Sequence, residues 1–273
     1  MSNLPPAGGD AGAQQKIRGV FSTQEIRRVG TGTTTRKTVQ KTFWFAEQLD
    51  DTTLECQPLN SNYIPSGPKR KVSMEELIAK FSPEPEFYLN SVYPKMQEMN
   101  RSVDAGDKHR EKGETFAAEF EYETALKLDE ENVRANFGIG LTYLQRGEKD
   151  KAEDIFDRLV KLDAAFEEEH KHLFNDFGIN LRKSKMFEQA IEYYSRALEL
   201  TKDDENLHIN LARAYLEAKD FAHCVEHLFA ALDLSPNHEN GLKFLEWLTV
   251  KGLVPNDQAE KAKTYLSSAG VQV

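Results

Sequence analysis

A repeat of about 34 residues organises the chain between residues 99 and 236. Its anchors are small residues at Gly106, Gly140, Gly178 and Ala212, so the spacings are 140 − 106 = 34, 178 − 140 = 38 and 212 − 178 = 34. A small residue lets two antiparallel helices approach closely, and neither helix of such a pair buries its apolar face alone. The pattern therefore predicts a stack of helix pairs. A second small residue and then a large apolar one follow each anchor, as Ala118 and Tyr122, Ala152 and Phe156, Ala190 and Tyr194, and Cys224 and Leu228.

This pattern resembles the tetratricopeptide repeat (TPR) family. The best-matched unit reads FGINLRKSKMFEQAIEYYSRALELTKDD at residues 177–204, and Pro236 stands where the family places its terminal proline. The resemblance implies an all-α superhelical solenoid with four repeats at 94–236. Residues 237–273 are expected to form a degenerate fifth repeat of capping helices, because the ends of such arrays need a polar cover. The four extra residues before the third repeat (38 − 34 = 4) predict a longer first helix there.

The N-terminal third differs in composition. Residues 1–35 are predicted to be a disordered basic arm, and residues 36–93 a short β-hairpin, a linker and a short helix. Val39–Ala46 and Leu54–Leu59 flank the turn residues at 50–53, which predicts an antiparallel pair of strands. The cluster Phe43–Phe45 is too apolar to face water and must be covered. Ser73 with Glu76 is a capping box that predicts the start of the short helix.

Charge narrows the classes of function. The chain carries 35 Lys and Arg against 45 Asp and Glu, a net charge of −10. Residues 1–98 hold 12 basic and 11 acidic groups, which leaves 23 against 34 for the repeats. Because affinity for phosphate backbones comes from Lys and Arg, nucleic acid is not expected as the main partner. No long apolar run or secretory leader is found, so we expect a cytoplasmic protein without a membrane span.

By analogy with the family, the first helix of each repeat lines a groove that binds another protein, as a peptide or a helix. Arginine suits carboxylates and carbonyls, and asparagine can bond both edges of an extended backbone. The alternative for the apolar residues Phe137 and Leu141 is that they pack against neighbouring helices or against the chain's own N-terminal arm. The predicted groove residues are Arg110, Arg134, Phe137, Leu141, Leu144, Asn175, Ile179, Arg182, Asn210 and Arg213.

One short motif suggests chemistry. His223, Glu226 and His227 match the H-x-x-E-H pattern of a class of zinc proteases. We expect these residues to be structurally idle, since Cys224 between them holds a packing position of the fourth repeat. We therefore predict a non-enzymatic adaptor with no cofactor and no metal. Two alternatives stay open, a secretion-type chaperone for an export substrate and a nucleic-acid-anchored adaptor that uses the basic arm.

Overall fold

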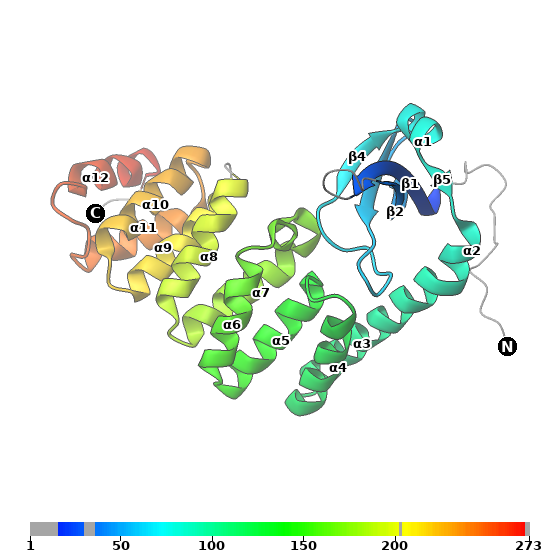
Figure 1. Cartoon of the computed structure of the whole chain (residues 1–273). Coiled ribbons are helices and arrows are strands. Elements are labelled where there is room, and N and C mark those ends of the chain that lie inside the picture. The colour runs from blue at the N-terminus through cyan, green and yellow to red at the C-terminus, as the bar shows by residue number, and fades with distance from the viewer. Residues whose placement is uncertain (1–15, 30–35, 202–203, 271–273) are drawn as a thin grey trace, which may run out of the picture. The chain divides into compact units, whose positions relative to one another are not determined.

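The computed structural model describes residues 16–29, 36–201 and 204–270. The chain divides into two compact units (Figure 1). The first, here the sheet unit, comprises residues 1–102 and 124–132. The second, the helical unit, comprises residues 103–123 and 133–273, so the long helices α3 (Tyr93–Glu111) and α4 (Thr115–Leu128) contribute to both.

The sheet unit contains a five-stranded antiparallel sheet in the order β4-β3-β2-β1-β5. The predicted hairpin is present as β2 and β3, which pair from Trp44 opposite Pro58 to Gln48 opposite Leu54. The arm prediction is wrong for part of its length, because Arg18–Val29 is a strand that pairs with β2 along its whole length. Val20 and Ser22 are buried, whereas Phe21 and Thr23 on the other face are only partly buried, so the segment has a covered face despite its basic charge. The strands are β1 (Arg18–Val29), β2 (Arg36–Gln48), β3 (Thr53–Pro58), β4 (Arg70–Ser73) and β5 (Ser82–Pro83).

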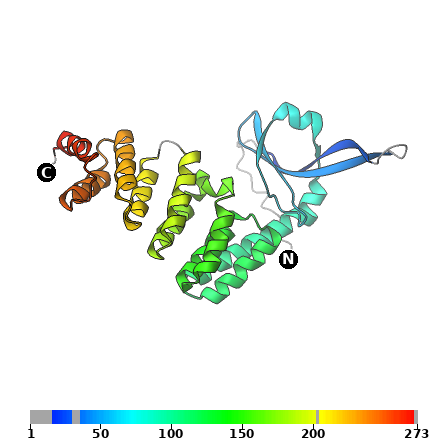
Figure 2. The same cartoon turned by 60° about the vertical axis from the view of Figure 1, so that its left-hand side comes forward.

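The hairpin of β1 and β2 continues beyond its neighbours, as Figure 2 shows. Strand β3 pairs with β2 only along Trp44–Gln48, and β5 pairs with β1 only at Phe21 and Ser22. The ends of β1 and β2 therefore pair with each other alone. The other residues of the predicted arm, 1–15 and 30–35, lie outside the described parts of the chain.

The aromatic cluster of β2 is covered on both sides of the sheet. Phe43 and Phe45 pack against Phe87 and Tyr88, with ring centroids 4.5 and 6.1 Å apart. Trp44 points the other way and meets Phe81 at 6.3 Å. The helices that supply this cover are α1 (Met74–Lys80), capped by the Ser73 hydroxyl as predicted, then α2 (Pro85–Phe87) and the π-helical turn η2 (Tyr88–Val92).

The loop after β3 closes the end of α4 within the same unit. The side-chain amides of Asn60 and Asn62 donate to the carbonyl oxygen of Leu128, at 2.9 and 3.0 Å. The hydroxyl of Ser66 donates to the buried carboxylate of Asp129 at 2.7 Å. These bonds satisfy carbonyl groups that a helix C-terminus otherwise leaves without a donor.

The helical unit consists of antiparallel helix pairs (Figure 1). Each first helix is followed within two residues by one with positive φ, namely Gly113, Gly147, Lys185, Lys219 and Gly252. The paired helices beyond α4 are α5 (Val133–Arg146) with α6 (Lys149–Leu159), α7 (Lys171–Lys183) with α8 (Phe187–Leu200), α9 (Glu205–Glu217) with α10 (Phe221–Leu234), and α11 (Glu239–Val250) with α12 (Ala259–Ser268). In the described part of the chain, no helix is both long enough and apolar enough to cross a membrane.

The anchor residues are small because neighbouring helices approach each other closely at these positions. A Cβ atom added at Gly178 would lie 2.4 Å from the hydroxyl oxygen of Tyr194, and one at Gly140 would lie 2.7 Å from the Phe177 ring. The expected longer helix in the third repeat is wrong, since α7 has 13 residues. The inserted residues instead form two short 3-10 turns, η3 (Asp163–Phe166) and η4 (Glu168–His170), which bring Phe166 onto the ring of Tyr193.

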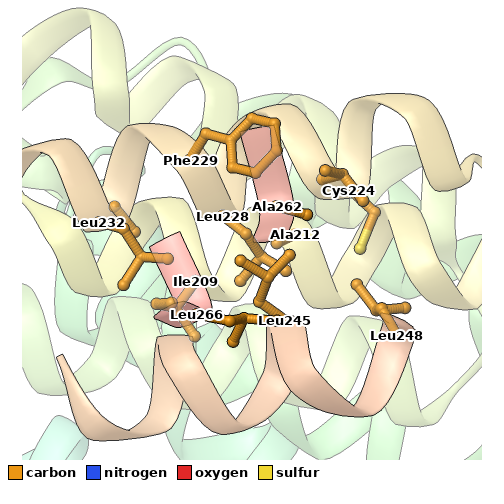
Figure 3. Packing of buried hydrophobic residues seen from close by; sticks show 12 residues of the cluster. Ile209, Ala212, Cys224, Leu228, Phe229, Leu232, Leu245, Leu248, Ala262 and Leu266 are labelled. Atoms are coloured by element: carbon orange, nitrogen blue, oxygen red, sulfur yellow. The ribbon is translucent and has the colours of Figure 1, made fainter. Parts of the chain in front are cut away.

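The pair α11 and α12 continues the stack beyond Pro236. Figure 3 shows Leu245 and Leu248 of α11 in one apolar cluster with Leu228 of α10 and Ala212 of α9. Ala262 and Leu266 of α12 belong to the same cluster. The capping function expected for residues 237–273 is consistent with this burial, while the outer side of α12 carries exposed charged residues.

Candidate functional site

The predicted groove residues fall into three groups. In the first repeats, Arg134 is held within the helical unit itself. Its guanidinium donates to Asp107 at 2.8 Å and to Asp104 at 3.1 Å. Asp107 also accepts the Tyr122 hydroxyl at 2.6 Å, and Arg110 lies beside that hydroxyl. Arg134 thus joins α5 to α3, and its charge is already neutralised by two carboxylates.

The predicted apolar centre of the groove is wrong. Phe137, Leu141 and Leu144 are all buried in the helical unit. The ring of Phe137 packs edge-on against Phe177 of α7 and Tyr193 of α8, with centroids 5.7 and 6.4 Å apart. The physical reason is that α5 carries apolar side chains on every face, and such a helix is surrounded by its neighbours. These three residues are therefore core.

On α7 and α9 the predicted residues stay partly accessible and form a connected set. The side-chain amide nitrogen of Asn210 donates to the side-chain oxygen Oδ1 of Asn175 at 3.4 Å. Ile179, one turn along α7 from Asn175, is half-buried. This pair of amides keeps further donor and acceptor atoms for a ligand, because each amide has two donors and two lone pairs.

Two arginines complete this set. Arg182 and Arg213 both lie near the hydroxyl of Tyr194, whose pKa is raised to about 12 by burial although both cations oppose the rise. Arg182 bonds to Glu217 at 3.4 Å, yet its side chain is only 13% exposed. Its Nε and Nη1 atoms are buried without a hydrogen-bond partner among the described residues. Arg213 is exposed, and no ion pair to it is found in the described ranges. Arg182 is therefore enclosed by its own chain and bonded to Glu217, and Arg213 is the arginine of this set that is open to a ligand.

The first helix of the fifth pair adds residues that the sequence reasoning did not assign to the groove. Asp204 caps α9 and His238 caps α11, and 238 − 204 = 34. The same spacing carries Arg213 to Trp247 (247 − 213 = 34) and Leu216 to Val250 (250 − 216 = 34). Extending the repeat register by one unit was the signal that could have identified them.

The H-x-x-E-H residues lie in α10 and do not converge. His223 is exposed and bonds to Asp220 at 2.6 Å, whereas His227 is partly buried and contacts His208 of α9, with 3.0 Å between the two Nδ1 atoms. The expectation that these residues are structurally idle is therefore wrong for His227, whose ring packs against His208 and Tyr215 of α9. Among the described residues, no group of three or more His, Cys, Asp or Glu side chains is arranged to hold a metal ion.

Comparison with protein-family models identifies the repeat. Two family models, both described as tetratricopeptide repeat, match residues 103–165 and 181–248. Among curated proteins, none matches the chain. Of the solved structures, PilF of Pseudomonas aeruginosa is 18% identical over 66% of this chain and 80% of its own, with a TM-score of 0.44. MamA is 22% identical over 63% of this chain and 90% of its own, with a TM-score of 0.46. YrrB, described as a TPR protein with an unusual peptide-binding site, is 22% identical over 62% and 82%, with a TM-score of 0.41.

Proposed function

Because the chain is a tetratricopeptide repeat protein, we propose that it is a scaffold that binds an extended segment of a partner protein along α7 and α9. The observation that carries the proposal is the exposed Arg213 of α9, which has no ion pair in the described ranges, together with the partly exposed amide pair of Asn175 and Asn210. Arginine donors fit carboxylates and main-chain carbonyls, and the amides can bond a peptide backbone. Together they match an extended segment better than a folded surface.

The proposal confines binding to the later repeats. In the earlier ones, Arg134 is paired with Asp104 and Asp107, and Phe137 is buried. These residues stabilise the stack of helices. The bound segment therefore needs to span only α7 and its successors, which carry the accessible polar groups.

The proposal includes no catalytic step. His223 and Asp220 form an exposed ion pair, and His227 is occupied by ring contacts with Tyr215 and His208. In this proposal the protein acts by binding a partner. We predict that it does so in the cytoplasm.

The test uses Arg213→Glu, because this side chain is exposed and its reversal disturbs no packing. Affinity capture with the wild type, followed by mass spectrometry, identifies the partner, and titration with that partner then compares the variants. We expect Arg213→Glu to weaken binding about tenfold or more, as loss of a charge-assisted hydrogen bond plus repulsion predicts. Glu192→Arg, an exposed change on α8, is the matched control. Equal affinity of the wild type and Arg213→Glu would remove α9 from the site.

A further inference from the structure

We propose that α11 extends this binding surface with an apolar end, so that the scaffold selects segments in which an acidic residue lies three positions from a large apolar residue. The inference rests on the proposed function and adds the chemical class of the partner segment. Its basis is a set of exposed apolar side chains on the first helix of the fifth pair, in register with the arginines of the preceding repeats.

The exposure of α11 is confined to one side. Leu245 and Leu248 are fully buried against α10 and α12, and Figure 3 shows both in the cluster with Leu228 and Ala262. Trp247, by contrast, is 44% exposed and Val250 is 71% exposed. The ring centroids of Phe244 and Trp247 lie 6.4 Å apart, and Phe244 is partly buried against the cluster. Phe244 therefore packs between Trp247 and the core. A tryptophan held in this way offers a large contact area at little cost in rotamer freedom.

The register places this apolar surface beside the cationic one. α11 packs directly on α9, since a Cβ at Gly241 would lie 3.1 Å from the Ile209 side chain, and the ring of His238 lies 3.4 Å from the Asn206 oxygen. Neighbouring helices lie about 8–10 Å apart. Arg213 and Trp247 occupy the same position of successive units, so about this distance separates the points at which they contact a ligand. A segment in the extended polyproline II conformation advances about 3.1 Å per residue and brings every third side chain to the same face, so this distance corresponds to about three residues.

Charge decides between occupants of the apolar end. Arg213 is exposed and has no ion pair among the described residues, and Glu217, the carboxylate one turn further along α9, is already bonded to Arg182. A segment with a carboxylate and an apolar anchor satisfies both requirements. A purely apolar segment would leave Arg213 unsatisfied, and a basic segment would face it with like charge.

The experiment selects ligands without assuming a partner. A random library of 12-residue peptides displayed on phage is selected on the full-length wild type, and the consensus peptide is synthesised with a fluorescent label. We expect a consensus with Asp or Glu three positions from Trp, Phe, Leu or Ile, in either chain direction. Anisotropy titration should then show Kd raised about tenfold or more in Val250→Lys and in Trp247→Ala.

Two controls keep the outcomes separate. The test variant Val250→Lys leaves the core intact, because Val250 is exposed. The control variant Leu234→Ala removes an exposed apolar side chain from α10 outside this surface and should bind the peptide like the wild type. In a Trp44→Phe background, Trp247 is the remaining tryptophan, and its emission should shift to shorter wavelength when the peptide binds. A consensus peptide that loses affinity in Arg213→Glu but not in Val250→Lys overturns this inference and leaves the proposed function standing. Selection of no peptide, or equal affinity in all variants, overturns both.

Discussion

The third and fourth repeats place different chemistry at the same two positions. In the third repeat, Phe174 of α7 stacks on Tyr193 of α8, with centroids 4.6 Å apart and an interplanar angle of 22°. The same positions one repeat later (174 + 34 = 208 and 193 + 34 = 227) hold His208 and His227, which stack at 5.3 Å and 29°. The geometry of the seam is thus retained, while an uncharged aromatic pair is exchanged for a pair that can take up protons.

The surroundings of the two pairs differ as well. Tyr193 is completely buried and meets five further rings besides that of Phe174, and its hydroxyl has no hydrogen-bond partner in the described part of the chain. The imidazoles instead belong to a column of four rings on α9 and α10. Adjacent centroids in this column lie 5.1, 5.5 and 5.3 Å apart, in the order His223, Tyr215, His227 and His208. A repeat can therefore keep its shape while its stability becomes dependent on pH. The rings around Tyr193 are those of Phe137, Phe156, Phe166, Phe177 and Tyr194.

The largest effect is expected when the third repeat receives the histidines of the fourth. Phe174→His with Tyr193→His removes two aromatic side chains from the centre of the ring cluster, and we expect a loss of about 3–5 kcal/mol of unfolding free energy at pH 7. The loss should grow at pH 5, because the unfolded chain then binds protons on both histidines while burial keeps the imidazoles of the folded state neutral. Urea titration followed by circular dichroism measures both values. Phe116→His, at an exposed position of α4, is the control. A loss no larger than that of the control would mean that the ring cluster does not stabilise the repeat.

The anchor residues distinguish the two repeats next. Gly178 faces the Tyr194 hydroxyl at a distance that leaves no room for a Cβ atom, whereas the fourth repeat pairs Ala212 with Leu228. Gly178→Ala should therefore destabilise by about 1–3 kcal/mol through overpacking, although alanine is the better helix former. Tyr194→Leu in the same chain should restore part of that loss, because it recreates the pair of the fourth repeat.

A double-mutant cycle measures this coupling. The four chains are the wild type, Gly178→Ala, Tyr194→Leu and the double variant, each unfolded in urea. Ala212→Gly is the reverse control and should cost about 1–2 kcal/mol, through helix propensity and the loss of a buried methyl group. Additive effects of the two changes would show that the contact between Gly178 and Tyr194 does not set the choice of anchor.

The pH dependence of the fourth repeat gives a smaller effect with a defined sign. Burial, followed by the neighbouring His208 and His223, lowers the pKa of His227 from 6.5 to about 4, and burial also lowers the pKa of His208. Folding thus favours the neutral rings. The stability they contribute is complete above about pH 6.5 and is lost as the pH falls toward 4. One Nδ1 must donate and the other accept, so protonation of both sets two donors against each other.

The carboxylates around the column temper this loss. Asp204 lies near His208, and Asp220 with Glu226 lies near His223, whose pKa is raised by its bond to Asp220. At about 1.4 kcal/mol per pKa unit, discounted because the His227 ring is partly exposed, roughly 1–2 kcal/mol should disappear between pH 7 and pH 4.5. His208→Phe with His227→Tyr, which imports the rings of the third repeat, should remove this dependence. Hydrogen exchange of α9 and α10 at the two pH values is the measurement. An unchanged pH dependence in this variant would assign it to other groups.

Much of this arrangement could be predicted from the sequence, because repeated small residues fix where helices touch. The helix pairs, the capping by Ser73 and the pairing of β2 with β3 followed from local patterns. The burial of Phe137 did not, since it depends on how α7 and α8 close over α5. The pairing of His208 with His227 was not predicted, because the two residues lie on different helices, α9 and α10, and the short motif covers α10 alone. Strand β1 was missed because charge and glycine near its end obscured its alternation.

The smallest difference between the two repeats is a single buried cysteine, whose thiol can report the local opening of the fourth repeat. Cys224 stands where the third repeat has Ala190, and burial raises the pKa of its thiol to about 12. Cys56 is also buried, in the core of the sheet unit. With Cys56→Ala, reaction with 4,4′-dithiodipyridine reports the opening of the fourth repeat, because the disulfide reagent also reacts in mild acid. With Cys224→Ala, the same reaction reports the opening of the sheet unit. This substitution should itself cost less than about 1 kcal/mol, because the side chain is short.

A loss of roughly 1–2 kcal/mol of stability at pH 4.5 should speed opening at Cys224 by about five- to thirtyfold relative to pH 7, after correction for reagent reactivity on free cysteine. Cys56 should show no such acceleration, and neither should Cys224 in the chain carrying His208→Phe and His227→Tyr. Equal acceleration at both thiols would mean that acid loosens the whole chain and that the histidine column has no special role.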